Sequence, residues 1–269
     1  MRVFTRLERF VRARLQEGSP LIMSHAVLGY PSFEQNEEQI DRFCESGVDL
    51  IELQIPFTEA VADGPILLQA NQHSVDRGTT VDQCMAFATK ICERRPETAF
   101  LFMTYLNPIL QRGLDQFVKE TAEAGVLGII CPDFPPEMAN AYRDRCDTAN
   151  VATVFLVAPT SPAARIKEIT DASTGMIYCV ARGGVTGRHT DFNRTFQEYI
   201  QQVRAATNLP IAVGFGVRNR TDLDALKGYA DVAAVCTEAV RLVDEEGLDA
   251  AARLLRSLAP DVRTNRRLG

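Results

Sequence analysis

Two carboxylates stand where an acidic side chain is costly unless it is paired or used in catalysis. Glu52 lies inside the apolar run 49–53, and Asp63 precedes the turn Gly64-Pro65. Because side chains alternate along a strand, Glu52 faces the opposite side from its two apolar neighbours. If that side is the interior of the fold, burial suits the carboxyl group to proton transfer near neutral pH. Two structural interpretations stay open: a salt-bridged Glu52 in the wall of the fold, and Asp63 as a helix N-cap or turn former.

Glycine and hydroxyl residues later in the chain form a pattern that is typical of a phosphate site. The segment 182–189 carries three glycines in five residues, which predicts a mobile loop that closes over a ligand. Gly214 and Gly216 flank Phe215, and Thr237 is placed to cap a short helix. Glycines let backbone N–H groups approach an anion, and a helix N-terminus attracts it. An ordinary flexible loop is the alternative for 182–189.

Short apolar runs alternate with longer stretches of helical periodicity along the chain. The runs are continuous rather than alternating in polarity, as expected for strands that are buried on both faces. Eight of them predict strands: 21–28, 49–53, 99–105, 127–131, 151–157, 175–180, 210–213 and 231–236. Helices are predicted at the N-terminus and after the successive strands: 3–16, 33–45, 80–94, 114–124, 137–148, 163–172, 192–206, 219–227 and 248–258.

Eight strand–helix units in 269 residues most simply close into a (β/α)8 TIM barrel, an α/β fold, with an extra N-terminal helix. The rival is an open doubly wound sheet, which would carry a Gly-rich phosphate turn where this chain has Leu28-Gly29-Tyr30-Pro31. No linker marks a boundary, so residues 1–269 are predicted to form one domain, with 261–269 as a disordered tail. Active sites of such barrels lie at the carboxyl ends of the strands, where Glu52 and Asp63 fall.

The composition argues against several classes of function. Its 29 Lys and Arg residues against 35 Asp and Glu residues leave a net charge of −6. That acidic balance argues against nucleic acid and anionic membranes as partners, and no apolar run is long enough to span a bilayer. Seven cysteines without a CxxC pair favour a cytoplasmic location over a disulfide framework. Three scattered histidines predict no metal site, and the N-terminus lacks the apolar core of a signal peptide.

Several motifs occur in order along the predicted barrel. The segment 52–65 reads ELQIPFTEAVADGP. Later strands are followed by Asn107-Pro108, Asp133-Phe134-Pro135, Ala158-Pro159-Thr160, Gly184-Val185-Thr186-Gly187 and Val213-Gly214-Phe215-Gly216. Over nearly its whole length the chain resembles the tryptophan synthase alpha chain family, whose signature is E-L-G-[IV]-P-[FY]-S-D-P-x-A-D-G-P.

The resemblance implies cleavage of indole-3-glycerol phosphate to indole and glyceraldehyde 3-phosphate, a retro-aldol-type lyase reaction without a cofactor. On this basis Glu52 would protonate the indole ring carbon and take the proton from the glycerol hydroxyl next to the breaking bond. Asp63 would hydrogen-bond the indole N–H and stabilise positive charge on the ring. The first role needs a carboxyl group that exchanges a proton, whereas the second needs one that stays ionised.

The resemblance also assigns residues that hold the substrate. Thr186, next to Gly187, would close its loop over the site and bond to Asp63. The phosphate would be held by Gly184, Gly214, Gly216 and Thr237. The indole pocket would be lined by His25, Met103, Ile130, Leu156, Tyr178 and Phe215. Core packing is the alternative for the pocket residues, above all for Met103 and Ile130.

Four departures from the family pattern fall near the expected site. Gln54 stands where the family usually has Gly, and 58–60 reads TEA instead of S-D-P. Cys236 replaces the Gly of a Gly-Ser pair, and His25 replaces an apolar residue against the indole. A packed His25 and a His25 that recognises a polar group on an altered substrate are both open. Together the departures indicate a specialised or standalone relative.

The resemblance further implies a partner, the tryptophan synthase beta chain in an alpha2beta2 complex, which would carry its own pyridoxal phosphate. Two other functions stay open: an alpha-like subunit that regulates a beta chain with little catalysis, and another phosphate-binding barrel such as a sugar-phosphate epimerase or isomerase. Retention of Glu52, Asp63 and the loop 184–187 argues against the first. Scattered histidines argue against a metal-dependent form of the second.

Overall fold

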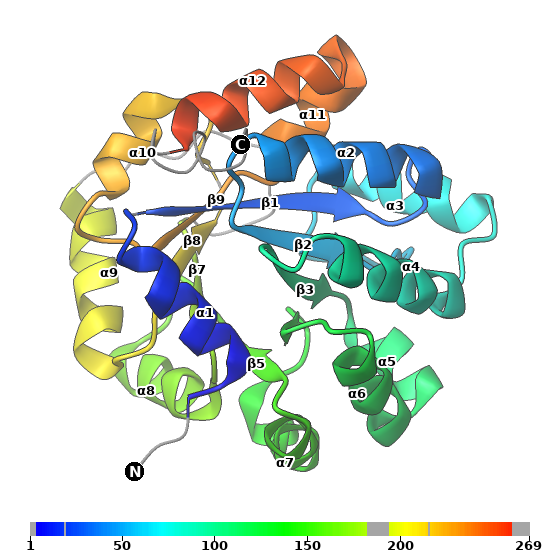
Figure 1. The fold of residues 1–269 in the computed structure, drawn as a ribbon. Coiled ribbons are helices and arrows are strands. Elements are labelled where there is room, and N and C mark those ends of the chain that lie inside the picture. The colour runs from blue at the N-terminus through cyan, green and yellow to red at the C-terminus, as the bar shows by residue number, and fades with distance from the viewer. Residues whose placement is uncertain (1–3, 19, 182–193, 215, 260–269) are drawn as a thin grey trace.

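The strands of the chain form one parallel sheet that curves back on itself. The structure is a computed structural model that describes residues 4–18, 20–181, 194–214 and 216–259 (Figure 1). Nine strands are hydrogen-bonded in the order β5-β4-β3-β2-β1-β9-β8-β7-β6. Their bounds are β1 Leu21–Val27, β2 Leu50–Gln54, β3 Ala99–Met103, β4 Gly128–Ile130, β5 Ala152–Val154, β6 Leu156–Val157, β7 Ile177–Val180, β8 Ile211–Gly214 and β9 Val232–Ala234. The predicted TIM barrel is confirmed, and the doubly wound alternative is wrong.

The barrel closes through the fifth predicted strand, which is two strands rather than one. The run 151–157 changes its hydrogen-bonding partner at Phe155: β5 pairs with β4, and β6 pairs with β7. Phe155 joins the halves, and its carbonyl accepts a hydrogen bond of 3.1 Å from the backbone N–H of Tyr178. The two strands at the ends of the sheet order are therefore consecutive in the chain, and the prediction of eight strands differs from the structure only at this junction.

Helices surround the barrel, and most begin and end within a few residues of the predicted bounds. Those predicted are α1 Arg6–Leu15, α2 Phe33–Glu45, α4 Val81–Arg94, α6 Leu114–Glu123, α7 Asn140–Ala149, α8 Ala163–Ala172, α9 Arg194–Ala206, α10 Arg220–Leu226 and α12 Leu248–Leu258. The prediction missed the helices α3 Pro65–Asp76 and α5 Leu106–Arg112 and the 3-10 turn η1 Pro136–Met138, and α11 Thr237–Glu246 is longer than expected. Within these described ranges no helix is both long and apolar enough to cross a membrane.

Alternation along the strands divides the core into two layers. On β2, Ile51 and Leu53 pack outward against the helices, whereas Leu50 points into the barrel with Met23 of β1 and Met103 of β3. Each buried side chain of this size stabilises the fold by about 1.5–3 kcal/mol relative to an exposed one. Because Glu52 shares the face of Leu50, this pattern turns Glu52 into the barrel.

Helix α1 closes the amino-terminal end of the barrel. Its side chains Leu7 and Val11 are fully buried in the inner layer of the core, and the helix crosses this end in Figure 1. A Cβ atom on Gly175, two residues before β7, would lie 2.9 Å from Leu7. The carboxyl end of the strands is therefore the end that is left for a ligand.

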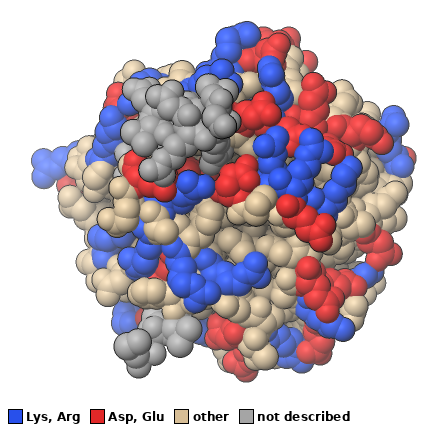
Figure 2. Space-filling view, in the orientation of Figure 1, with Lys and Arg blue, Asp and Glu red and all other residues tan. Residues whose placement is uncertain are grey.

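Charged side chains of both signs cover the outside of the barrel. On the face in Figure 2, Lys and Arg are interspersed with Asp and Glu. Exposed pairs include Lys90 with Glu37 and Arg165 with Glu137, and such pairs contribute about 0–1 kcal/mol each.

The predicted tail 261–269 lies outside the described residues.

Candidate active site

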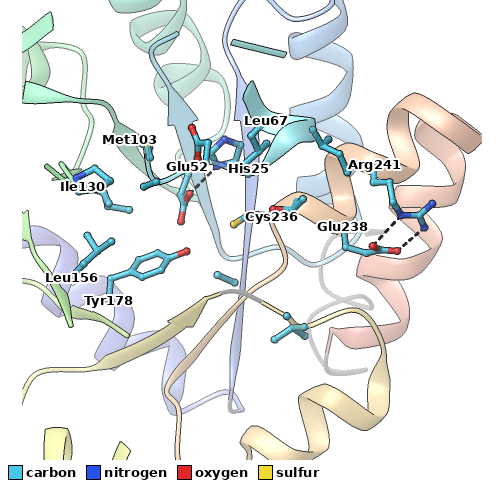
Figure 3. A pocket seen from close by; sticks show the side chains of 18 of the residues that line it. His25, Glu52, Leu67, Met103, Ile130, Leu156, Tyr178, Cys236, Glu238 and Arg241 are labelled. Carbon is cyan, nitrogen blue, oxygen red and sulfur yellow. Dashed lines mark hydrogen bonds and ion pairs between the residues drawn. The ribbon is translucent and has the colours of Figure 1, made fainter. Parts of the chain in front are cut away.

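A cavity of about 260 Å³ lies at the carboxyl end of the strands. Strands β1, β2, β3, β4, β6, β7 and β9 each supply one lining side chain, and the start of α11 supplies more (Figure 3). The predicted site residues that line the cavity are His25, Glu52, Asp63, Met103, Ile130, Leu156, Tyr178, Gly216 and Thr237. The structure thus brings together residues from segments that are far apart in sequence.

Glu52 and His25 form a buried pair in the floor of this cavity. They are register partners on the adjacent strands β2 and β1, and they are 4% and 1% exposed. Nδ1 of His25 lies 2.8 Å from Oε2 of Glu52. The other oxygen, Oε1, is buried and accepts no hydrogen bond from the described residues. Glu52 is therefore paired, as the structural interpretation expected, but its partner His25 also lines the cavity, so the pairing leaves both side chains in the site.

Gln54 joins this pair to the second carboxylate. Its Oε1 lies 2.8 Å from Nε2 of His25, and its Nε2 donates to Oδ2 of Asp63 at 2.6 Å. Gln54 points into the barrel because it is two residues beyond Glu52 on the same strand. A continuous chain of hydrogen bonds therefore runs from Glu52 through His25 and Gln54 to Asp63.

Asp63 is a buried acceptor and not a helix cap. The N-cap of α3 is Gly64, which makes no side-chain cap, and Pro65 follows as the first helical residue. The carboxylate accepts hydrogen bonds from Gln54 and, at 3.4 Å, from Nδ2 of Asn71. Burial raises the pKa of Asp63, although the Gln54 hydrogen bond and the charge of His25 oppose that rise. That Asp63 is ionised during the reaction stays a prediction.

The pKa values of His25 and of two neighbouring side chains are shifted from their usual values. Burial by itself would lower the pKa of His25, but the hydrogen bond and charge of Glu52 outweigh it and the net pKa is raised. Burial raises the pKa of Tyr178 and of Cys236 well above their usual values, and the negative charge of Glu52 adds to both shifts. Tyr178 and Cys236 are therefore neutral hydrogen-bonding groups at physiological pH.

The start of α11 presents backbone donors to the cavity. Its N-cap is Cys236, which makes no side-chain cap, and Thr237 is the first helical residue. The prediction that Thr237 caps the helix is thus wrong by one position. The first N–H groups of a helix have no partner inside it and suit an anion. Gly216 lines the same part of the cavity.

Gly214 makes room for the ring of Tyr178. It ends β8, where the ring of Tyr178 occupies the space that a side chain would fill, and it is not among the residues that line the cavity. Its role in phosphate binding stays a prediction. Four other predicted site residues, Gly184, Thr186, Gly187 and Phe215, lie outside the described residues.

Sequence reasoning missed about half of the cavity wall. The residues that it did not name are Ala62, Ile66, Leu67, Pro132, Val217, Arg218, Ala234, Glu238 and Arg241. Arg241 lies one helical turn after Thr237 and hydrogen-bonds Glu238 at 2.7 and 3.1 Å. The spacing of four residues within a helix was the available signal, because such residues share a face.

One group of side chains also has the composition of a metal site. Ligand atoms of His25, Glu52 and Cys236 lie within 4.8 Å of one another. Both ring nitrogens of His25 are engaged in hydrogen bonds, and a metal would require the thiolate that burial of Cys236 disfavours. The donor set therefore fits a hydrogen-bonded cluster better than a metal site, and the absence of a metal stays a prediction.

A family model and the sequence relatives of this chain name the same family. A family model described as tryptophan synthase alpha chain matches residues 11–264. The tryptophan synthase alpha chain of Desulfotalea psychrophila is 44% identical over 252 residues, which cover 94% of this chain and 99% of that relative. The corresponding protein of Syntrophotalea carbinolica is 42% identical over the same shares of both chains.

Solved structures agree with the sequence relatives. Tryptophan synthase from Mycobacterium tuberculosis superposes with a TM-score of 0.90 at 30% identity, covering 97% of this chain and 99% of that one. A chain from a structure described as the tryptophan synthase a2b2 complex of Pyrococcus furiosus gives a TM-score of 0.81 at 27% identity. It covers 89% of this chain and 97% of its own length.

Proposed function

Since the chain belongs to the tryptophan synthase alpha chain family, we propose that it is the lyase that cleaves indole-3-glycerol phosphate to indole and glyceraldehyde 3-phosphate. The observation that carries this proposal is the placement of Glu52 and Asp63. Both carboxyl groups are nearly fully buried, and both line one cavity at the carboxyl end of the barrel. Such a pair supplies a proton-transferring group and a charge-stabilising group to one substrate.

The proton transfers use Oε1 of Glu52, the oxygen that has no partner among the described residues. It gives a proton to the indole ring carbon, and the ring becomes a cation that the carboxylate of Asp63 stabilises. Glu52 then takes the proton of the adjacent glycerol hydroxyl. The O–H electron pair forms the aldehyde C=O, the C–C bond breaks, and its electrons return to the ring. Glu52 ends as it began, so the reaction needs no cofactor.

The rest of the cavity supports this substrate. Met103, Ile130, Leu156 and the ring of Tyr178 offer an apolar wall of the kind that an indole needs. The backbone at Gly216 and the start of α11 at Thr237 offer donors to a phosphate. Arg218 and Arg241 also line this region and supply positive charge.

A beta chain partner is supported by exposed apolar side chains at the same end of the barrel. Val61, Leu110 and Met138 are 70%, 53% and 69% exposed, and they lie on the segments that follow β2, β3 and β4. These three strands are neighbours in the sheet, and large apolar side chains exposed on one side of a molecule are typical of an interface. We therefore place the beta chain over this end, as expected for an alpha2beta2 assembly.

We also propose that the protein is located in the cytoplasm. All seven cysteines lie in the described ranges, and no disulfide joins any of them. A reducing compartment suits a chain with this many thiols.

The test is indole release from indole-3-glycerol phosphate by the purified chain, with and without a tryptophan synthase beta chain. Slow release that rises sharply with the beta chain is the result expected of an alpha subunit. Fast release without a partner would indicate a standalone lyase and would agree with the departures at Gln54 and 58–60. No release under either condition would overturn the proposal and favour a regulatory subunit or another phosphorylated substrate.

A further inference from the structure

Two of the residues that depart from the family pattern, His25 and Gln54, form a bridge between the two carboxylates of the site. We propose that His25, with its ring held by Gln54, is a positioning residue that donates from Nδ1 to Oε2 of Glu52, and so makes Oε1 the atom that exchanges the proton with substrate. This inference rests on the proposed function. It gives His25 and Gln54 a role toward the two carboxylates that the resemblance does not assign.

Strand register explains why the bridge spans these residues. His25 is the register partner of Glu52, and Val27 is the partner of Gln54. His25 therefore lies opposite Glu52 and diagonal to Gln54, where a long side chain on the same face can reach it. The two ring nitrogens point in different directions, and each is 2.8 Å from one of these two neighbours. An apolar residue at 25 and a glycine at 54, as in the family pattern, would provide neither contact.

The chemistry of donors and acceptors then determines where the protons lie. An ionised Asp63 only accepts, so the NH2 group of Gln54 faces it and Oε1 of Gln54 faces His25. Nε2 of His25 must carry a proton to donate to that oxygen. Once Glu52 has given its proton to the ring carbon it also only accepts, so Nδ1 carries a proton as well. His25 is therefore an imidazolium between two carboxylates, which agrees with its raised pKa.

The same arrangement serves both protonation states of Glu52. When Oε1 takes the hydroxyl proton from substrate, Oε2 still accepts from Nδ1, and no hydrogen bond in the bridge has to rearrange. When Oε1 gives that proton to the ring carbon, the imidazolium stabilises the carboxylate that remains. His25 keeps both of its protons throughout, so the proton balance of the reaction is unchanged. Fixed donors of this kind lower barriers because they need no reorganisation during the reaction.

The charges around His25 support this assignment. Glu52 from β2 and Asp63 from the following loop are the groups whose charge raises its pKa. Tyr178 from β7 and Cys236 before α11 also border the cavity, and burial keeps both neutral. Farther along the cavity wall lie Arg218, Glu238 and Arg241, and the latter two pair with each other.

The experiment is a double-mutant cycle with His25→Phe, Gln54→Gly and the double variant, assayed for indole release. Each single change leaves buried polar groups without partners, and we expect kcat to fall about 10- to 100-fold with a smaller change in KM. The double variant recreates the family pattern and removes both partners of the His25–Gln54 contact together, so we expect its loss to be smaller than the product of the two single losses. Single variants near the wild-type rate, or a double variant that shows the product of the two losses, would overturn the inference.

Two further readouts separate this role from a merely structural one. Nitrogen-15 spectra of the ring should show His25 doubly protonated at pH 7.5, above its ordinary pKa of 6.5. Wild-type kcat should fall as the pH rises through the raised pKa of His25, and the double variant should lack that fall. His25→Asn, whose side-chain amide takes the place of Nδ1, should be more active than His25→Phe at neutral pH. A neutral His25 ring at pH 7.5 contradicts the bridge.

The matched control is His73→Phe, because His73 is an exposed histidine on α3 that packs edge-on against Tyr30 outside the cavity. It should leave kcat and the pH profile unchanged. If the wild-type chain releases no indole, the proposed function fails, and the ring spectra still test the bridge without any assay of activity. If His25→Phe does not fold, by circular dichroism, the Asn and double variants carry the comparison.

Discussion

A Cβ atom on Gly214 would lie 2.5 Å from Cε1 of the Tyr178 ring. The two residues belong to paired strands, with Val180 as the register partner of Gly214. The absent side chain at the end of β8 is thus what allows the phenol to lie in the cavity wall. The position of the ring therefore depends on Gly214 as much as on its own strand.

Gly214→Ala should push the Tyr178 ring out of place and reduce substrate affinity. Overpacking of this kind costs about 1–3 kcal/mol of stability, and the displaced ring narrows the apolar wall for an indole. Thermal unfolding and the KM for indole-3-glycerol phosphate measure the two effects. A variant with wild-type KM and unchanged Tm would show that the ring has room to move and that the close approach is not required.

Glu52→Gln should abolish most turnover while leaving substrate binding nearly intact. The amide keeps the shape of the side chain but cannot exchange a proton, and general acid–base catalysis contributes about 10²–10⁴-fold to rate. Single-turnover assays combined with equilibrium binding of substrate separate the two quantities. Near-normal turnover in this variant would remove Glu52 from the mechanism.

Asp63→Asn should also lower turnover, and it should raise stability at neutral pH. Burial raises the pKa of Asp63 above its ordinary value of 3.8, so the folded chain binds this proton more tightly than the unfolded chain. Stability therefore falls as the pH rises from 3.8 through the raised pKa, and the ionised carboxylate is destabilising above it. Asn removes that cost and keeps an acceptor for Gln54. The measurement is the free energy of unfolding of the wild type and of Asp63→Asn from pH 4 to 8. The difference between the two proteins should shrink toward pH 4.

The barrel, and the fact that Glu52 faces away from its two apolar neighbours, were predictable from sequence because they depend on local periodicity. Apolar runs predicted the strands, and the alternation of side chains predicted that Glu52 faces away from Ile51 and Leu53. The two core layers confirm the alternation. The helices α3 and α5 were missed for local reasons. α5 has seven residues and an internal Pro108, and α3 buries the polar Asn71 and Ser74 on its packed face.

The bridge of His25 and Gln54 was not predictable, because it depends on the relative register of two strands. His25 and Glu52 are 27 residues apart, and no local pattern states which residue of one strand faces which residue of the next. Sequence reasoning singled out both residues as departures but left them unconnected. Arg218 and Arg241 were not predicted as site residues for another reason. Arginines are common in loops and on helix surfaces, and only the fold shows that these two line a cavity.

Thr237→Val should weaken phosphate binding with less effect on the chemical step. Valine keeps the volume of the side chain and removes the hydroxyl, and a hydrogen bond to a charged group contributes about 1.5–3 kcal/mol. KM for indole-3-glycerol phosphate should therefore rise about tenfold or more. Inhibition by inorganic phosphate should weaken in parallel. Thr148→Val, at an exposed position on α7, is the control, and equal effects in both variants would exclude a phosphate role for Thr237.

Met138→Asp and Leu110→Asp should weaken association with a tryptophan synthase beta chain without harming the chain alone. Both side chains are more than half exposed and neither lines the cavity, so a charge there costs little in the isolated protein. Buried in an apolar interface, the same charge would lack a partner and would oppose binding. Titration of indole release with the beta chain should show a larger amount needed for half-maximal stimulation, with the unstimulated rate unchanged. Phe4→Asp, an exposed apolar position before α1 at the other end of the barrel, should leave the titration as in the wild type. If all three variants respond equally, the partner does not bind over Leu110 and Met138.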